Sequence, residues 1–220
     1  MSLLDTRTHY SRAEFLSDAV VHVLGLVFVL ISVPVLITVT AFVRGDAPAM
    51  IGTVVYGATL LLMILCSGLY NTVGHGNWSW LLQRLDHSAI YAKIAGTYTP
   101  FALLSGQGGW LVAGLWGAAL AGMGLKLFSP RRFRRAALAL YLGMGWAGLA
   151  FGGGLIGALS TPVITLILIG GILYTLGVIL YLFDRLPYHY TAWHVMVLAA
   201  SVTLYSAVTL QVVQTSVLPA

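Results

Sequence analysis

The sequence contains few charged residues. Of its 220 residues, 8% are charged and 59% are hydrophobic, and the mean hydropathy is +0.93. A soluble domain carries about a quarter charged residues, so this chain lacks the polar surface to dissolve in water. Several segments hold roughly 20 mostly apolar residues, the length with which an α-helix crosses the hydrocarbon core. The composition therefore predicts a polytopic membrane protein.

Other features are also missing. The single cysteine, Cys66, excludes an internal disulfide, so cysteine usage does not indicate a redox compartment. The first residues, "MSLLDTRTHYSRAEFLSD", lack an apolar core followed by a small-residue cleavage site, so no cleaved signal peptide is expected. Four of the eleven basic residues lie in "SPRRFRR". The net charge of +5 is too clustered to indicate a nucleic-acid partner.

Hydropathy and helix-breaking residues divide the chain into seven predicted spans within one domain, residues 1–220. The spans cover about residues 18–43, 48–73, 85–104, 110–128, 135–151, 162–183 and 190–213. We therefore predict an all-α fold, a bundle of seven transmembrane helices.

Arginines in the connections predict the orientation of this bundle. With a cytoplasmic N-terminus, eight arginines fall inside and only Arg44 falls outside. The eight are Arg7, Arg12, Arg84, Arg131, Arg132, Arg134, Arg135 and Arg185. Since short cytoplasmic loops carry an excess of Lys and Arg, we predict a cytoplasmic N-terminus and an outer C-terminus.

Polar residues of four predicted spans lie at one depth in this topology. They are His22 in the first span, Ser67 and Asn71 near the end of the second, Asp86 and His87 at the start of the third, and His194 in the seventh. Ionisable groups inside membrane segments are costly and usually face the bundle interior or water. Their convergence predicts a shared polar cavity near the cytoplasmic face.

These residues also have simpler structural interpretations. Asp86 and His87 could cap the third span at the wet interface. Ser67 could bond a carbonyl of its own helix, and His22 or His194 could be an interhelical hydrogen-bond partner. The predicted site therefore rests on the convergence of several residues.

Two further charged residues need an interpretation. Asp18, at the start of the first span, is interpreted as its N-cap rather than as part of the site. Lys93 lies seven residues after Asp86, on roughly the same helix face but about 10 Å away at 1.5 Å rise per residue. Lys93 could reach Asp86 through an intermediary or by snorkelling, or it needs a partner deeper in the bundle.

Four segments give the chain a family likeness: "AEFLSDAVVHVLG", "CSGLYN", "LDHSAIYAKIAGTYTPF" and "PYHYTAWHVMVLAAS". From Glu14 to about Val208 it resembles the hemolysin III family, bacterial relatives of the progestin and adipoQ receptors. That family belongs to a wider seven-helix group that includes alkaline ceramidases, in which Ser, Asp and three His form a zinc site associated with hydrolysis of lipid amides. The resemblance implies a multi-pass protein of a bacterial plasma membrane, with membrane lipids as partners.

Four residues match the pattern of this group. Ser67 and Asp86 match the serine and aspartate, which would orient a water that attacks a lipid carbonyl. His194 matches a histidine ligand of the last span, and His22 matches the histidine of the first span. The resemblance thus implies catalytic roles for Ser67 and Asp86 and zinc-ligand roles for His194 and His22.

Other positions depart from that pattern. Asn71, Tyr190 and Leu204 stand where histidines are usual. His189 lies one residue away from Tyr190 and so on a different helical face. Because catalytic zinc takes three protein ligands and keeps an open position, a complete site needs a further ligand, such as Asp86 or a rotated His189.

Three functional hypotheses follow. The first is a metal-dependent hydrolase acting on a membrane lipid from a cavity open to the inner leaflet. The second is a non-enzymatic transporter, receptor or membrane-homeostasis protein, favoured by Lys93 because a hydrolase has no evident use for it. The third, suggested by the family name, is a cytolysin. The composition argues against it because a secreted toxin needs a soluble form, and haemolysis on overexpression could be a secondary effect.

Overall fold

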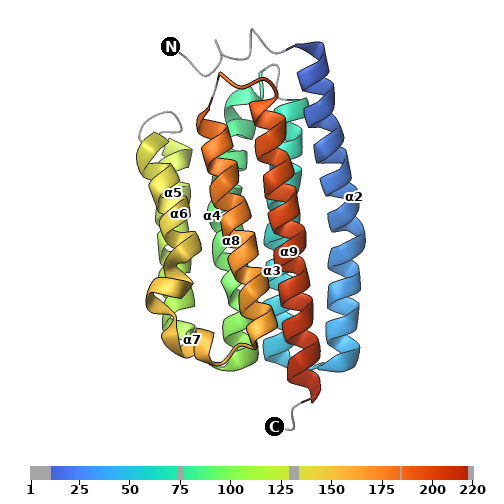
Figure 1. Cartoon of the computed structure of the whole chain (residues 1–220), viewed down its shortest axis with the longest axis vertical. Helices are drawn as coiled ribbons and strands as arrows, with labels where there is room; N and C mark the ends of the chain where they lie inside the picture. Colours follow the sequence, from blue (N-terminus) through green and yellow to red (C-terminus); the bar gives the residue numbers. More distant parts are fainter. Residues whose placement is uncertain (1–10, 74–76, 129–133, 184, 218–220) are drawn as a thin grey trace.

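The computed structural model describes residues 11–73, 77–128, 134–183 and 185–217, and this part of the chain is all-helical, as predicted (Figure 1). Eight helices are described: α2 (Arg12–Val43), α3 (Ala47–Thr72), α4 (Ser79–Ser105), α5 (Gly109–Phe128), α6 (Arg134–Phe151), α7 (Gly153–Gly157), α8 (Thr161–Leu182) and α9 (His189–Val217). Successive long helices run in opposite directions, so the start of α2 and the end of α9 lie at opposite ends of the bundle (Figure 1).

Helix α2 begins earlier than the predicted first span because its first turn is capped. Ser11 Oγ accepts a hydrogen bond from the Glu14 backbone N–H at 3.1 Å, and Glu14 Oε2 accepts one from the Ser11 N–H at 2.9 Å. This capping box satisfies two backbone donors that would otherwise be unpaired. The interpretation of Asp18 as the N-cap is therefore wrong, since Asp18 lies inside the helix and is buried.

Helix α4 also begins before its predicted span. Its N-cap is Trp78 and its first residue is Ser79, so Asp86 and His87 lie about two turns inside it at 3.6 residues per turn. The alternative interpretation of these two residues as a cap is therefore wrong. Asp86 is buried, whereas His87 is half-buried.

The exposed surface of α2 is mostly apolar, whereas the ionisable side chains of Asp18 and His22 are buried. Val20, Leu24 and Ile31 are 56%, 57% and 61% exposed, whereas Asp18 and His22 are 4% and 8% exposed. A water-soluble helix has the opposite arrangement, so the outer face of α2 suits a lipid environment. Five of the described helices are long and apolar enough to cross a membrane: α2, α3, α5, α8 and α9. That all seven predicted spans cross remains a prediction.

Helix α4 lies at the centre of the bundle, where it contacts α3, α5, α6, α7 and α9. Its approach to α3 is close enough that a Cβ on Gly52 would lie 2.8 Å from Pro100 Cα. Small residues permit such close packing of membrane helices. The central position keeps Asp86 and Lys93 buried and away from the outer surface.

The connection between α2 and α3 is fixed to the end of α9. Arg44 donates from Nε to Asp46 Oδ2 at 2.7 Å and from Nη1 to the Thr215 carbonyl at 2.9 Å. Asp46 is also the N-cap of α3, accepting from the Ala49 N–H. Its hydrogen bond from Arg44 lowers the pKa of the Asp46 carboxyl below its usual range. Arg7, Arg131 and Arg132, used for the orientation prediction, lie outside the described residues.

Candidate active site

A cavity of about 520 Å³ runs through the bundle. Asp18, His22 and His194 line it near the starts of α2 and α9, and Leu155 and Ile156 line it at α7. Its volume falls within the range of about 300–1,000 Å³ that is usual for small-molecule sites. It is therefore large enough to hold a ligand that extends from a polar end to an apolar end.

The structure brings most of the predicted site residues to this cavity. Those that line it are His22, Ser67, Asn71, Asp86, His87, Lys93 and His194. His189 does not line it; its ring is half-buried at the start of α9, with Nδ1 3.2 Å from the Leu186 carbonyl oxygen.

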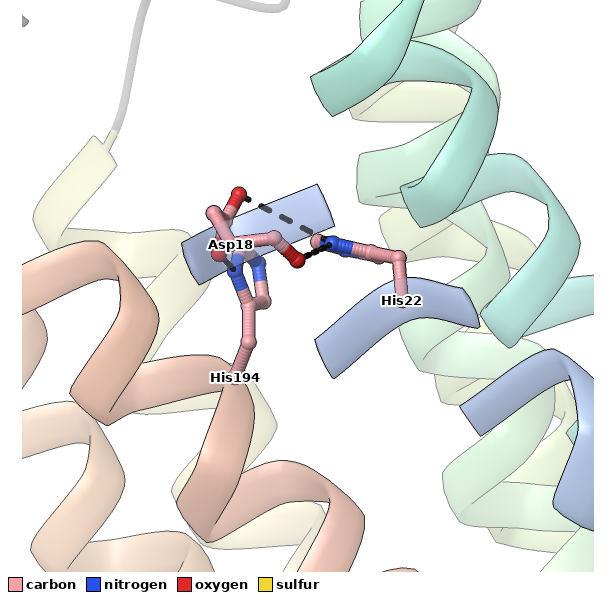
Figure 2. A group of neighbouring side chains, drawn as sticks. All are labelled: Asp18, His22 and His194. Carbon is pink, nitrogen blue, oxygen red and sulfur yellow. Dashed lines mark hydrogen bonds and ion pairs between the residues drawn. The ribbon is translucent and has the colours of Figure 1, made fainter. Parts of the chain in front are cut away.

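The first and last described helices are joined at the polar end of the cavity by Asp18 and His194. His194 Nδ1 lies 2.5 Å from Asp18 Oδ1 (Figure 2). Because a carboxylate accepts hydrogen bonds, this contact places a proton on Nδ1 of a neutral His194 and leaves the lone pair on Nε2. Asp18 thus determines which nitrogen of His194 is available to a ligand.

His22 is oriented in the same way by its own helix. Its Nδ1 lies 2.8 Å from the Asp18 backbone carbonyl and 3.7 Å from Asp18 Oδ2 (Figure 2). A carbonyl can only accept, so Nδ1 carries the proton and Nε2 holds the lone pair. His22 Nε2 is 3.2 Å from Ser67 Oγ on α3, and the His22 and His194 ring centroids are 4.4 Å apart.

Ser67 connects this group to α3. Its hydroxyl meets His22, and Asn71 donates from Nδ2 to the Ser67 carbonyl at 3.0 Å and to Ser67 Oγ at 3.4 Å. The Ser67 hydroxyl is therefore engaged across the helix interface, in contrast to the alternative in which it only bonds a carbonyl of its own helix. We call Asp18, His22, Ser67, Asn71 and His194 the polar cluster.

Three members of the polar cluster could hold a metal ion. Asp18, His22 and His194 each offer one ligand atom, and these atoms lie within 4.8 Å of one another. Two imidazoles and one carboxylate are a donor set that catalytic zinc accepts. The residues present therefore fit a divalent metal such as zinc. Asp86 lines the same cavity but is not one of these three residues.

Asp18 is the residue that sequence reasoning missed. It lies four residues before His22, and residues at this spacing share one face of a helix. This four-residue spacing could have identified Asp18 as a neighbour of His22. Because Asp18 lies at the expected start of the first span, it was interpreted as the N-cap instead. Asp18 is the third of the side chains that could hold a metal ion here, beside His22 and His194.

Lys93 lies deeper in the cavity than the polar cluster. It is 2% exposed, and its Nζ lies 4.7 Å from the centroid of the Tyr174 ring. A cation at this distance from an aromatic face is attracted by the ring. Lys93 therefore has an aromatic contact on α8. The polar cluster, by contrast, lies nearer the helix ends.

Comparison with known proteins gives one matching family model and relatives that cover most of this chain. A family model described as Haemolysin-III related matches residues 13–205. The protein named Hemolysin-3 from Bacillus cereus is 37% identical over 208 residues, which cover 92% of this chain and 94% of the relative. The Hemolysin-3 homolog of Bacillus subtilis (strain 168) is 36% identical over 200 residues, covering 89% of this chain and 92% of that protein.

Proposed function

The chain belongs to the Haemolysin-III related family, as its motifs predicted, and from this premise we propose that it is a metal-dependent hydrolase of membrane lipids. The family and the five apolar helices agree with the predicted multi-pass location in the plasma membrane. The proposed orientation, with the N-terminus in the cytoplasm, places the polar cluster near the inner leaflet.

One observation carries the proposal: the polar cluster lies at one end of a cavity whose other end is apolar. Such a cavity suits an amphipathic molecule with its reactive polar bond at the cluster and its chain along the apolar wall. Membrane lipids have this shape, and a lipid amide is the substrate class that the family resemblance suggests. The cavity therefore supports a lipid as the substrate.

The side chains of the polar cluster and Asp86 would have different roles in the proposed hydrolysis. Asp18 holds the protons of both histidines on Nδ1, so Nε2 of each ring carries a lone pair. The lone pair of His194 faces no hydroxyl donor among the described hydrogen bonds, whereas that of His22 accepts from the Ser67 hydroxyl, which would turn away when a metal binds. For Asp18 to join His22 and His194 as a ligand, its carboxylate would have to leave His194 Nδ1. Zinc held in this way would supply Lewis-acid activation of a carbonyl and of water. The Ser67 hydroxyl and the Asn71 amide are hydrogen-bond donors beside this position, and Asp86 is the proposed proton acceptor.

Metal content and activity of the detergent-purified protein test this proposal. We expect about one zinc per chain and hydrolysis of a fluorogenic N-acyl lipid amide. His194→Ala should lose both. His189→Ala is the matched control, since His189 lies on the same helix but outside the cavity, and it should keep both.

Three results would contradict the proposal. The first is a metal-free protein, purified without chelator, that remains folded. The second is an equal loss of zinc from His189→Ala and His194→Ala, which would indicate a general effect of changing the start of α9. Hydrolysis that persists at an unchanged rate in His194→Ala would also reject the assigned site.

A second candidate function is transport or sensing without catalysis. The buried Lys93 favours it because an intramembrane cation commonly marks an ion or substrate pathway. Replacing Lys93 should then alter ion or proton flux in liposomes while the fold is retained. Unchanged flux in that variant would remove the support.

A further inference from the structure

Lys93 lies at the middle of the bundle. It is near the centre of α4, Tyr174 is near the centre of α8, and Ser201 is near the middle of α9. The Lys93 ammonium contacts the Tyr174 ring, and the Tyr174 hydroxyl lies 2.9 Å from Ser201 Oγ. The tyrosine is thus held in place by α9 while its ring faces the cation.

The charge of Lys93 is not balanced within the described part of the chain. The ion pairs found there join other residues, and the Lys93 ammonium has no hydrogen-bond acceptor among the described side chains and carbonyls. A buried ammonium without a counter-charge is costly, and a single aromatic ring offsets only part of that cost. An anion in the cavity beside Lys93 would supply the missing partner.

The cavity beyond Lys93 has apolar walls. Residues that line it towards α7 include Ile94, Phe101, Leu155, Ile156, Ile164 and Leu204. Two polar side chains of the same stretch, Thr97 and Tyr98, direct their hydroxyl groups to backbone carbonyls. This end of the cavity therefore offers a chain-shaped ligand apolar contacts.

The length of this apolar stretch matches one acyl chain. From Lys93 to the end of α4 at Ser105, twelve residues at 1.5 Å rise span about 18 Å. One leaflet contributes about half of the roughly 30 Å hydrocarbon core, so a membrane acyl chain extends about 15 Å. A ligand with its anionic group at Lys93 would fit its chain between Lys93 and α7.

We propose that Lys93 binds the carboxylate of a long-chain fatty acid, with the acyl chain lying in the apolar part of the cavity. A carboxylate is favoured over a phosphate monoester because Lys93 provides one positive charge at this depth, and a second negative charge would stay buried and unpaired. A diacyl phospholipid would also need room for two chains. This site is separate from the polar cluster, so the inference does not depend on hydrolysis.

Binding to delipidated, full-length protein in detergent tests this assignment. The probes are palmitic acid labelled with ¹³C at the carboxyl carbon and hexadecanol, which has the same chain without the charge. We expect the acid to bind at least about tenfold more tightly than the alcohol, since a hydrogen bond to a charged group is stronger than a neutral one. The ¹³C resonance of the bound acid should remain that of a carboxylate.

Three variants locate the carboxylate. Lys93→Met should reduce acid affinity at least about tenfold and leave hexadecanol affinity unchanged, while Lys93→Arg should retain part of the preference for the acid. Lys126→Met is the matched control, because Lys126 is the other buried lysine that lines the cavity, and it should bind like the wild type. His194→Ala should also bind the acid normally, which separates this site from the proposed hydrolase centre.

The inference fails if the wild-type protein binds the acid and the alcohol equally. That result does not depend on whether any variant folds. It also fails if Lys126→Met, rather than Lys93→Met, removes the preference for the acid, because the carboxylate would then lie near the helix ends. Loss of acid binding in His194→Ala alone would place the carboxylate at the polar cluster.

Discussion

The bundle contains two buried polar regions that treat charge differently. In the polar cluster, the Asp18 carboxylate accepts a hydrogen bond from His194 on another helix, and the second histidine bonds both a backbone carbonyl and Ser67. At mid-bundle, the Lys93 ammonium contacts an aromatic ring and faces the cavity. The side chains of the first region are hydrogen-bonded within the protein, so this region stabilises the fold as well as forming the proposed site. The second is incomplete within the described residues, which indicates that a ligand completes it.

The difference also has an energetic consequence. Removing one partner from a satisfied buried group leaves the other unpaired, which is strongly destabilising. Removing a cation that has no counter-charge takes away a desolvation cost larger than its contact with one aromatic ring. Substitutions in the two regions should therefore change the free energy of unfolding in opposite directions, and this expectation can be measured.

The largest effect is expected at Asp18. Asp18→Ala removes the acceptor for His194 and should lower the free energy of unfolding by about 3 kcal/mol, measured by chemical unfolding in detergent. Asp18→Asn keeps an acceptor oxygen for His194 and should cost clearly less. Equal losses in the two variants would show that the hydrogen bond to His194 does not stabilise the cluster.

A smaller effect of opposite sign is expected at Lys93. In delipidated protein, Lys93→Met should raise the free energy of unfolding by about 1 kcal/mol, because replacing a buried charge with an apolar side chain of similar size is often stabilising. For a chain of this size, that change raises Tm by roughly 2–4 °C. Adding palmitic acid should stabilise the wild type clearly more than the variant, which binds the acid more weakly. A destabilised variant would mean that Lys93 already has a partner in the empty protein.

The smallest effect is expected at Tyr174. Tyr174→Phe loses the hydrogen bond with Ser201 but keeps the ring under Lys93. Interhelical hydrogen bonds in a membrane protein average about 0.6 kcal/mol. The free energy of unfolding should therefore fall by about that amount. Fatty-acid affinity should fall less than in Lys93→Met. A loss as large as that of Lys93→Met would assign the anion to the tyrosine hydroxyl.

The helices could be predicted well from the sequence because apolar length and breaker residues determine where a chain can be helical in a membrane. The ends were harder. Helices α2 and α4 each begin six residues before the predicted span. Their first turns, after the N-caps Ser11 and Trp78, lie in sequence too polar for a prediction from hydropathy to include in a span. That error explains why Asp18 was assigned to a cap.

The site could be predicted in part. Placing His22, Ser67 and His194 at one depth required only the alternation of helix direction. The partner of each side chain depended on rotation about the helix axes, which hydropathy does not determine. Thus the Asp18–His194 contact and the Tyr174 ring beneath Lys93 became evident only in the structure.

The contact between Asp18 and His194 also bears on biosynthesis. The two residues are separated by 176 positions in the chain, and ribosomes add about 5–20 residues per second. The carboxylate therefore emerges roughly 9–35 s before its imidazole partner. We expect nascent chains that lack the last helix to insert with an unmatched acidic group, which would make them recognisable to the quality-control proteases of the membrane.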